Sequence, residues 1–302
     1  MNPKHANTLY NYAVMLDTHL KRKEEAEAIY RSCLQCEPKH AFALYNLAVL
    51  LEERLFSSAH SASTSNAALK QLQQRKEEVG QLYKKAVEAD PRDASTLADY
   101  GRFLLVRMDE AVKGRQALQA ALKMNPSCEI ALYHLAVIQH RQEPPDLTAA
   151  ADMLKALISV APQHANGHLQ LARVLSDLYR KELTSIATER EGGGTEKEKA
   201  RLERAFTEIC RHYEKAMTAM REPGDAALEY LKLAAAYGNV FHKRRIVELC
   251  SMAVNSGLSS SAAVQAAGVL SPAAEADLRA LQMAKVWIEK INSTLLSEQT
   301  ES

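Results

Sequence analysis

The sequence predicts an all-α protein built from repeated pairs of antiparallel helices. Its 302 residues include only 11 Gly and 9 Pro, whereas average usage would give roughly 36 of these two residues together. A chain so poor in turn-forming residues, with 47% hydrophobic residues, favours long helices over a β-sandwich, a barrel or a Gly-rich nucleotide-binding sheet. The prolines that remain recur at a nearly constant interval, and this interval indicates an internal repeat.

The period is visible in a short motif around the prolines. Asn2-Pro3-Lys4-His5-Ala6 returns 35 residues later as Glu37-Pro38-Lys39-His40-Ala41, and Pro162 begins a third Pro-x-His-Ala motif. The steps from Pro91 to Pro126 and from Pro126 to Pro162 are 35 and 36 residues. The step from Pro38 to Pro91 is 53 residues and therefore predicts an insertion.

Two amphipathic helices are expected between successive prolines. The first helix of each unit carries a small residue ten places after its proline, namely Ala13, Ala48, Gly101, Ala136 and Ala172. The second helix carries a triplet with spacings of four and three, which places its members on one helical face. The triplets are Ala26, Tyr30, Cys33; Val79, Tyr83, Ala86; Gly114, Leu118, Ala121; Ala150, Leu154, Leu157; Ile209, Tyr213, Ala216; and Ile246, Cys250, Ala253. A small residue allows the second helix to approach, and proline ends the pair.

These features resemble the tetratricopeptide repeat (TPR). Tyr10-Asn11-Tyr12-Ala13 through Pro38, and then Tyr45-Asn46-Leu47-Ala48, fit its pattern of a large apolar residue, Leu-Gly or Leu-Ala, then Ala, an aromatic residue, Ala and a final Pro. Five units match well and a sixth matches weakly. The resemblance implies an all-α, right-handed superhelical solenoid of antiparallel helix pairs, closed by a C-terminal capping helix.

The expected repeat array covers residues 1–258. Its units are 6–38, 41–91 with an insertion at 56–75, 93–126, 128–162, 164–221 with an extended hairpin around 176–204, and 226–258. Ser57 to Ser65 has the composition of a mobile loop, whereas strong helix formers flank Gly192–Gly194 and favour a protruding helical hairpin over a domain boundary. Residues 259–302 are expected to form capping helices, chiefly 272–297, and a short polar tail. The first motif looks like a repeat end, so a preceding repeat or a partner is expected beside it.

Several arrangements that could bear chemistry are present, but none forms a complete set. Cys33-x-x-Cys36 with His40 lacks the remaining ligands of a zinc site, and His164 with His168 is better explained by the repeated turn. Gly192–Gly194 lacks the Lys and Ser/Thr of a phosphate-binding loop. No nucleophile signature is found. The sequence therefore predicts a protein that is not an enzyme and has no cofactor or metal.

Charge and cysteine content narrow the class of partner. The 38 Lys+Arg nearly balance the 37 Asp+Glu, which argues against nucleic acid as the partner. Lys243-Arg244-Arg245 is read as a solvated helix start rather than a nucleic-acid patch. No apolar run is long enough for a membrane span. Five cysteines in a chain of this size imply no disulfide framework, so a reducing, cytoplasmic location is expected.

The candidate binding site lies on the first helices, which the resemblance places along a concave groove. Two places before each small residue stand polar groups, and one place earlier tyrosines recur. Amides beside aromatic rings can bind an extended peptide backbone and pack its side chains. The predicted groove residues are Tyr10, Asn11, Tyr45, Asn46, Asp99, Tyr133, His134 and Gln170.

The expected function is a non-catalytic scaffold that binds a partner peptide or helix in this groove. Chaperone-binding relatives hold an acidic C-terminal tail with a clamp of Lys, Arg and Asn. Asn46 matches one clamp residue, but Tyr10, Ser95 and Asp99 occupy the expected basic places, so this mode is disfavoured. Two alternatives remain: an RNA-binding helical-repeat protein, because RNA-reading arrays share the period, and the interaction arm of a larger enzyme or assembly.

Overall fold

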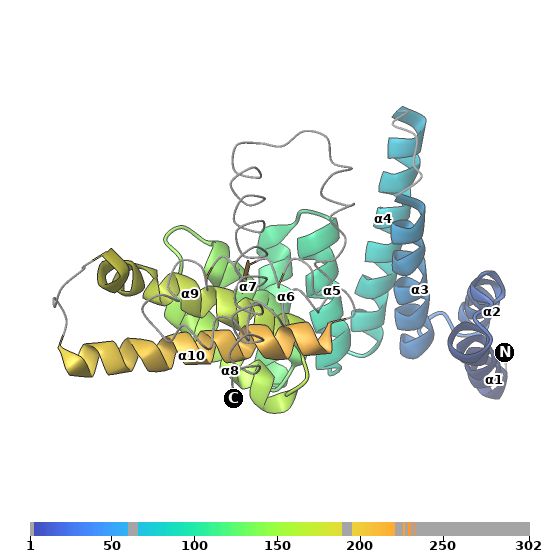
Figure 1. The fold of residues 1–302 in the computed structure, drawn as a ribbon. Helices are drawn as coiled ribbons and strands as arrows, with labels where there is room; N and C mark the ends of the chain where they lie inside the picture. Colours follow the sequence, from blue (N-terminus) through green and yellow to red (C-terminus); the bar gives the residue numbers. More distant parts are fainter. Residues whose placement is uncertain are drawn as a thin grey trace, which may run out of the picture. The chain divides into compact units, whose positions relative to one another are not determined.

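A computed structural model describes residues 3–59, 66–188 and 195–220 together with Ala226, Glu229, Tyr230 and Leu233. These residues form α-helices α1 to α10 and one short π-helix, η1, and no strand is present among them. The chain divides into two compact units, Met1–Leu135 and Ala136–Ser302, and each is described by itself. Figure 1 shows the helices in chain order.

The first unit consists of successive helix pairs. Its elements are α1 (Pro3–Val14), η1 (Met15–His19), α2 (Lys23–Cys36), α3 (Ala41–Ala59), α4 (Asn66–Ala89), α5 (Ala94–Arg107) and α6 (Ala111–Met124). Helices α1 and α2, α3 and α4, and α5 and α6 pack as pairs, while α2 also packs on α3 and α4 on α5. Helix α7 (Glu129–Arg141) begins in this unit and crosses its boundary.

The second unit contains α8 (Leu147–Val160), α9 (Ala165–Thr188) and α10 (Glu196–Ala219). Helix α9 packs against both α8 and α10, and it forms with α10 a long antiparallel pair; Figure 1 shows α9 in yellow-green and α10 in yellow to orange. Each of these two helices has 24 residues. A capping box begins α10, because Thr195 accepts a hydrogen bond from the Glu198 backbone N–H while the Glu198 carboxylate accepts one from the Thr195 N–H.

The Pro-x-His-Ala motif is a helix start. Nδ1 of His40 accepts the Ala43 backbone N–H at 3.2 Å, and Nδ1 of His164 accepts the Gly167 N–H at 2.8 Å. Each histidine thereby satisfies one of the free N–H groups at the beginning of α3 or α9. Asp93 does the same for α5 by accepting the Ser95 N–H at 2.9 Å. In these two copies of the motif the histidine caps a helix, whereas His5 of the first copy lies within α1.

The predicted packing triplets form the core of both units. All fifteen residues of the five triplets that the structure describes are buried, and Tyr30, Tyr83 and Leu118 are among the largest fully enclosed side chains. The small first-helix residues are buried too, including Ala13, Ala48 and Ala172 at 0% exposure. The sixth triplet, Ile246, Cys250, Ala253, and the predicted capping helix at 272–297 lie outside the described residues.

The surplus in the second helix pair is helical at both of its ends. Helix α3 continues through Ser57 and Ser58 to Ala59, and α4 already begins at Asn66. Helix α4 therefore has 24 residues, compared with 14 in α2. The segment that follows Asn66 is rich in Ala, Leu, Lys, Gln and Glu, all strong helix formers. This composition explains why the part of the surplus that follows Asn66 is helical, whereas residues 60–65 lie outside the described residues.

No helix within the described ranges is long and apolar enough to cross a membrane.

Candidate functional site

The first-helix face of the first unit brings together part of the predicted groove. Asn46 Nδ2 on α3 donates to the Tyr10 hydroxyl on α1 at 3.3 Å. The Tyr10 ring lies 5.0 Å from the His40 ring and 6.2 Å from the Phe42 ring, measured between centroids. Tyr10 and Asn46 are half-buried, whereas Asn11 is exposed. Two residues of the predicted amide-and-tyrosine ladder thus lie in direct contact.

Phe42 is a feature of this face that the sequence analysis did not single out. Its side chain is 61% exposed although it is large and apolar. Its exposure could have been suspected from the repeat pattern, because the corresponding place in α1 and α5 holds the polar residues Asn7 and Ser95. A solvated phenylalanine beside a half-buried tyrosine is a surface feature that often marks an interaction site.

Tyr45 and Asp99 are joined to each other. The Tyr45 hydroxyl donates to Asp99 Oδ2 at 2.9 Å, and Arg102 Nε donates to Asp99 Oδ1 at 3.1 Å. Asp99 is only 9% exposed. In the sequence Asp99 is a negative charge that would repel a ligand carboxylate, but in the structure the Arg102 guanidinium pairs with it. The negative potential in the groove is therefore weaker than the sequence suggested.

Glu52 is the centre of this network. Arg102 donates to both of its carboxylate oxygens at 2.8 and 2.7 Å, and the Tyr83 hydroxyl donates to Oε2 at 2.8 Å. Arg107 approaches Oε1 at 3.4 Å. Burial by itself would raise the pKa of Glu52, but the hydrogen bonds and charges of Arg102, Tyr83 and Arg107 lower it below its usual value. A buried ion pair with this many donors holds α3, α4 and α5 in register.

The remaining predicted groove residues lie elsewhere. On α7 the Tyr133 and His134 rings are 5.1 Å apart in an edge-on arrangement, and both are half-buried. Gln170 belongs to the second unit, is 6% exposed, and donates through Nε2 to His140 Nδ1 at 2.8 Å. His140 Nε2 in turn lies 2.8 Å from Asp177 Oδ2. Gln170 is therefore an internal hydrogen-bonding residue of the second unit.

The side chains considered as metal ligands are engaged in ordinary contacts. The Cys33 thiol donates to the Ala6 carbonyl at 3.3 Å, and burial raises its pKa to about 11. His40 uses Nδ1 for the helix cap and Nε2 for Asn7 Oδ1 at 3.0 Å. Within the part of the chain that the structure describes, no group of three or more His, Cys, Asp or Glu side chains is placed to hold a metal ion. The four described cysteines are free thiols.

The second unit contains a pair of histidines that the sequence did not predict, of which His168 is buried and His212 is half-buried. Nδ1 of His168 on α9 lies 2.8 Å from Nδ1 of His212 on α10, and the two rings stack at 5.1 Å. His168 Nε2 must donate to the Pro162 carbonyl at 2.9 Å, so a neutral His168 accepts at Nδ1 from His212. Burial lowers the pKa of both, His212 to about 4, and the neighbouring Lys215 and Arg211 lower it further.

Acidification is expected to destabilise the second unit through this pair. Because His212 takes up a proton less readily when folded than when unfolded, its stabilising contribution is complete above the unfolded pKa near 6.5 and declines as pH falls toward 4. Between about pH 7.5 and pH 5.5 we expect His212 to account for a loss of about 1 kcal/mol in the free energy of unfolding. Urea unfolding followed by circular dichroism at both pH values measures it.

The matched variants are His212→Gln and His19→Gln. The first should flatten the pH dependence of stability, because glutamine can still donate to His168 but does not titrate. The second replaces an exposed histidine of η1 and should leave the dependence unchanged. Equal pH dependence in wild type and His212→Gln would show that the pair is not the source.

Comparisons with known proteins place this geometry among helical repeats. No family model matches the chain, and no curated protein matches it. Many solved structures do match. PilW, described as a widely conserved type IV pilus biogenesis factor, is 16% identical with a TM-score of 0.57 over 89% of this chain and 100% of its own. PilF of Pseudomonas aeruginosa is 18% identical with a TM-score of 0.55 over 84% of this chain and 91% of its own.

A weaker likeness is found to the human IFIT1 dimer with m7Gppp-AAAA. It is 16% identical with a TM-score of 0.48, and the match covers 78% of this chain and 46% of that chain. PilF and PilW are tetratricopeptide-repeat proteins. At these identities the similarity concerns the fold alone.

Proposed function

We propose that this chain, which has the tetratricopeptide-type helical-repeat fold, is a non-catalytic scaffold. It binds a protein partner on the first-helix face of α1 and α3. Neighbours of this fold are generally interaction scaffolds. The single observation that carries the proposal is the 61% exposed Phe42 packed beside Tyr10. An exposed aromatic side chain held by a second ring can fill a pocket on a partner without much loss of conformational freedom.

The polar residues near Phe42 indicate that the ligand presents backbone hydrogen-bonding groups. Asn11 is exposed and Asn46 is half-buried, so both can exchange hydrogen bonds with the backbone of an extended peptide. Tyr45 and Asp99 support this face from within, since they bond to each other. We therefore propose Tyr10, Asn11, Phe42 and Asn46 as the contact residues, and a peptide or helix with apolar side chains as the ligand. A cytoplasmic location is part of the same proposal.

The proposal is tested in two steps with the full chain. Affinity purification with crosslinking mass spectrometry identifies a partner and the crosslinked residues, and titration then gives its affinity. Phe42→Ala should weaken binding about tenfold or more, as loss of a buried aromatic anchor does. Val112→Ala, which shortens a 71% exposed residue on α6, is the matched control and should change affinity little. Unchanged affinity in Phe42→Ala, or crosslinks confined to α4, α9 and α10, would exclude this face.

RNA binding is the alternative with a direct test. The near balance of 38 basic and 37 acidic residues supports a protein partner over RNA. A mobility shift with single-stranded RNA that persists at physiological salt and weakens steeply as salt rises would reverse this ranking. If the chain is instead the interaction arm of a larger assembly, we expect the same contact face to bind. The crosslinking step tests this alternative as well.

A further inference from the structure

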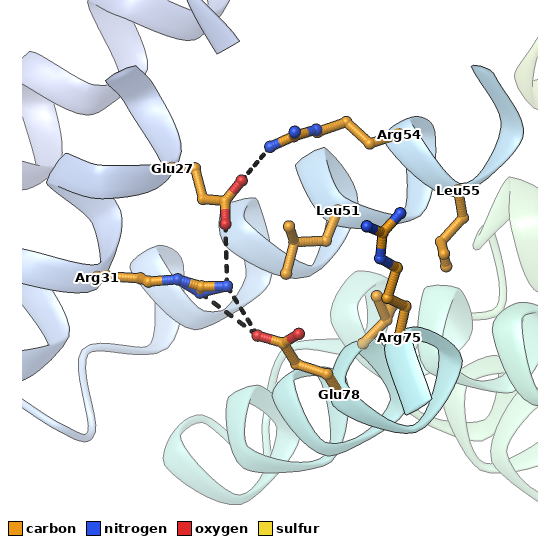
Figure 2. Close-up of a pocket in the computed structure, with 8 residues that line it drawn as sticks. Glu27, Arg31, Leu51, Arg54, Leu55, Arg75 and Glu78 are labelled. Atoms are coloured by element: carbon orange, nitrogen blue, oxygen red, sulfur yellow. Dashed lines mark hydrogen bonds and ion pairs between the residues drawn. The ribbon is translucent and has the colours of Figure 1, made fainter. Parts of the chain in front are cut away.

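A charged hollow of about 220 Å³ lies between α2, α3 and α4 of the first unit. Figure 2 shows Glu27 and Arg31 from α2, Leu51, Arg54 and Leu55 from α3, and Arg75 and Glu78 from α4 around it. Val79 completes the lining and is buried. The hollow therefore has an apolar base and a charged rim, and it uses residues distinct from the Phe42 face.

Two of the three arginines have carboxylate partners inside the hollow. Arg31 bridges Glu27 at 2.9 Å and Glu78 at 2.8 Å. Arg54 pairs with Glu27, and its approach to the exposed Glu24 is at the 4.0 Å limit. Glu27 is thereby shared between two guanidinium groups, as the dashed lines in Figure 2 show.

Arg75 is the third arginine, and it makes no ion pair with any residue in the described ranges. In Figure 2 its guanidinium points into the hollow toward Arg54 and away from the Glu78 carboxylate. Three guanidinium groups against two carboxylates leave one positive charge in the lining. An unpaired arginine beside a second arginine is a favourable place for a single carboxylate, which guanidinium groups bind through parallel hydrogen bonds.

The lengthening of α4 places Arg75 there. Relative to α2, α4 has ten additional residues at its start, because Val79 in α4 corresponds to Ala26 in α2 while the helices begin at Asn66 and Lys23. Arg75 is the last of these ten residues. A helix pair of ordinary length would lack this arginine, so the extension supplies the free positive charge of the hollow.

We propose that this hollow is a second binding site, which takes an acidic side chain of a partner protein together with a neighbouring leucine-sized residue. The carboxylate contacts Arg75 and Arg54, and the apolar residue contacts Leu51 and Leu55. The lining carries one net positive charge, which matches a monoanionic carboxylate rather than a dianionic phosphate. The site extends the proposed scaffold function to an acidic segment, but it does not depend on the Phe42 face.

The test uses the full chain and two labelled peptides. One peptide is built from Gly-Leu-Glu-Ser units, and the other has Gln in place of each Glu. Fluorescence anisotropy at low salt should show binding of the glutamate peptide only. Arg75→Gln should weaken that binding about fivefold to tenfold, as loss of a charge-assisted contact does. Arg92→Gln, at an exposed arginine of the turn before α5, is the matched control and should leave it within about twofold.

Other results of this experiment would overturn the proposed acidic-segment site in the hollow. Equal affinity for the two peptides, or equal affinity of wild type and Arg75→Gln, overturns the proposal. Weakening by Phe42→Ala without weakening by Arg75→Gln would assign the peptide to the Phe42 face, so failure of the two proposals can be told apart. Displacement of the glutamate peptide by inorganic phosphate at lower concentration than by free glutamate would show that phosphate is the preferred anion and overturn the carboxylate assignment.

Discussion

Glu52→Ala is expected to lower the free energy of unfolding of the first unit by about 3–5 kcal/mol. Glu52 is 5% exposed and accepts hydrogen bonds from Arg102 and Tyr83. Its removal leaves the half-buried Arg102 guanidinium with only Asp99 as a counter-charge and the buried Tyr83 hydroxyl without its acceptor. Urea unfolding at neutral pH, followed by circular dichroism, measures the loss.

Glu53→Ala is the matched control for this change. Glu53 is the next residue of α3, its side chain is 55% exposed, and it pairs with Lys23 at the surface. An exposed ion pair contributes about 0–1 kcal/mol, so this variant should be nearly as stable as the wild type. Similar losses for the two variants would mean that the buried network does not hold α3, α4 and α5 together.

Gly114→Ala is expected to destabilise the first unit by about 2 kcal/mol, although alanine favours helix. A Cβ at this position would lie 2.8 Å from the Gly101 carbonyl oxygen and 2.9 Å from the Leu105 backbone nitrogen. Both obstacles are backbone atoms, so α5 and α6 would have to separate. The two glycines face each other at the closest approach of this pair, and thermal or urea unfolding of the variant reports the cost.

Gly80→Ala, in the neighbouring helix α4, is the matched control, because a Cβ at this position has room. A Cβ there would meet only the Phe103 ring at 3.4 Å, which is an ordinary contact. We expect this variant to be stabilised by roughly 0.5–1 kcal/mol, because alanine loses less conformational freedom than glycine in a helix. If Gly114→Ala were also stabilising, close approach of α5 and α6 would not be what requires glycine at residue 114.

The helix pairs could be predicted because their signals are local. Tyr30, Tyr83 and Leu118 occupy the same place in successive second helices, and their burial follows from a spacing that any helix converts into one face. The histidine of the Pro-x-His-Ala motif was assigned to a turn for the same reason, and its ring caps a helix. The predicted Ser57–Ser65 loop is contradicted only at its first three residues, which belong to α3, because residues 60–65 lie outside the described residues.

The candidate site was only partly predictable because its properties depend on contacts between helices. The sequence does not show that Arg102 and Tyr45 lie beside Asp99 and donate hydrogen bonds to its carboxylate. The sequence predicts Gln170 as an amide that faces the groove, but in the structure its side-chain amide donates a hydrogen bond to His140 within the second unit. The exposure of Phe42 has a weak signal in the repeat pattern, but the lack of an ion-pair partner for Arg75 has none, since it is defined only by neighbouring elements.

The sequence by itself determined the repeat: which segments pair as helices, which face of each is buried, and that no catalytic signature accompanies them. These properties depend on residues within one or two helical turns, over which periodicity, proline and capping act. The tertiary structure decided which polar groups form hydrogen bonds or ion pairs inside the molecule and which remain available to a partner. That division depends on distances between residues far apart in the chain, such as Tyr45 to Asp99 and Arg31 to Glu78, and a hydrogen bond or ion pair forms only when packing brings such groups within about 3 Å.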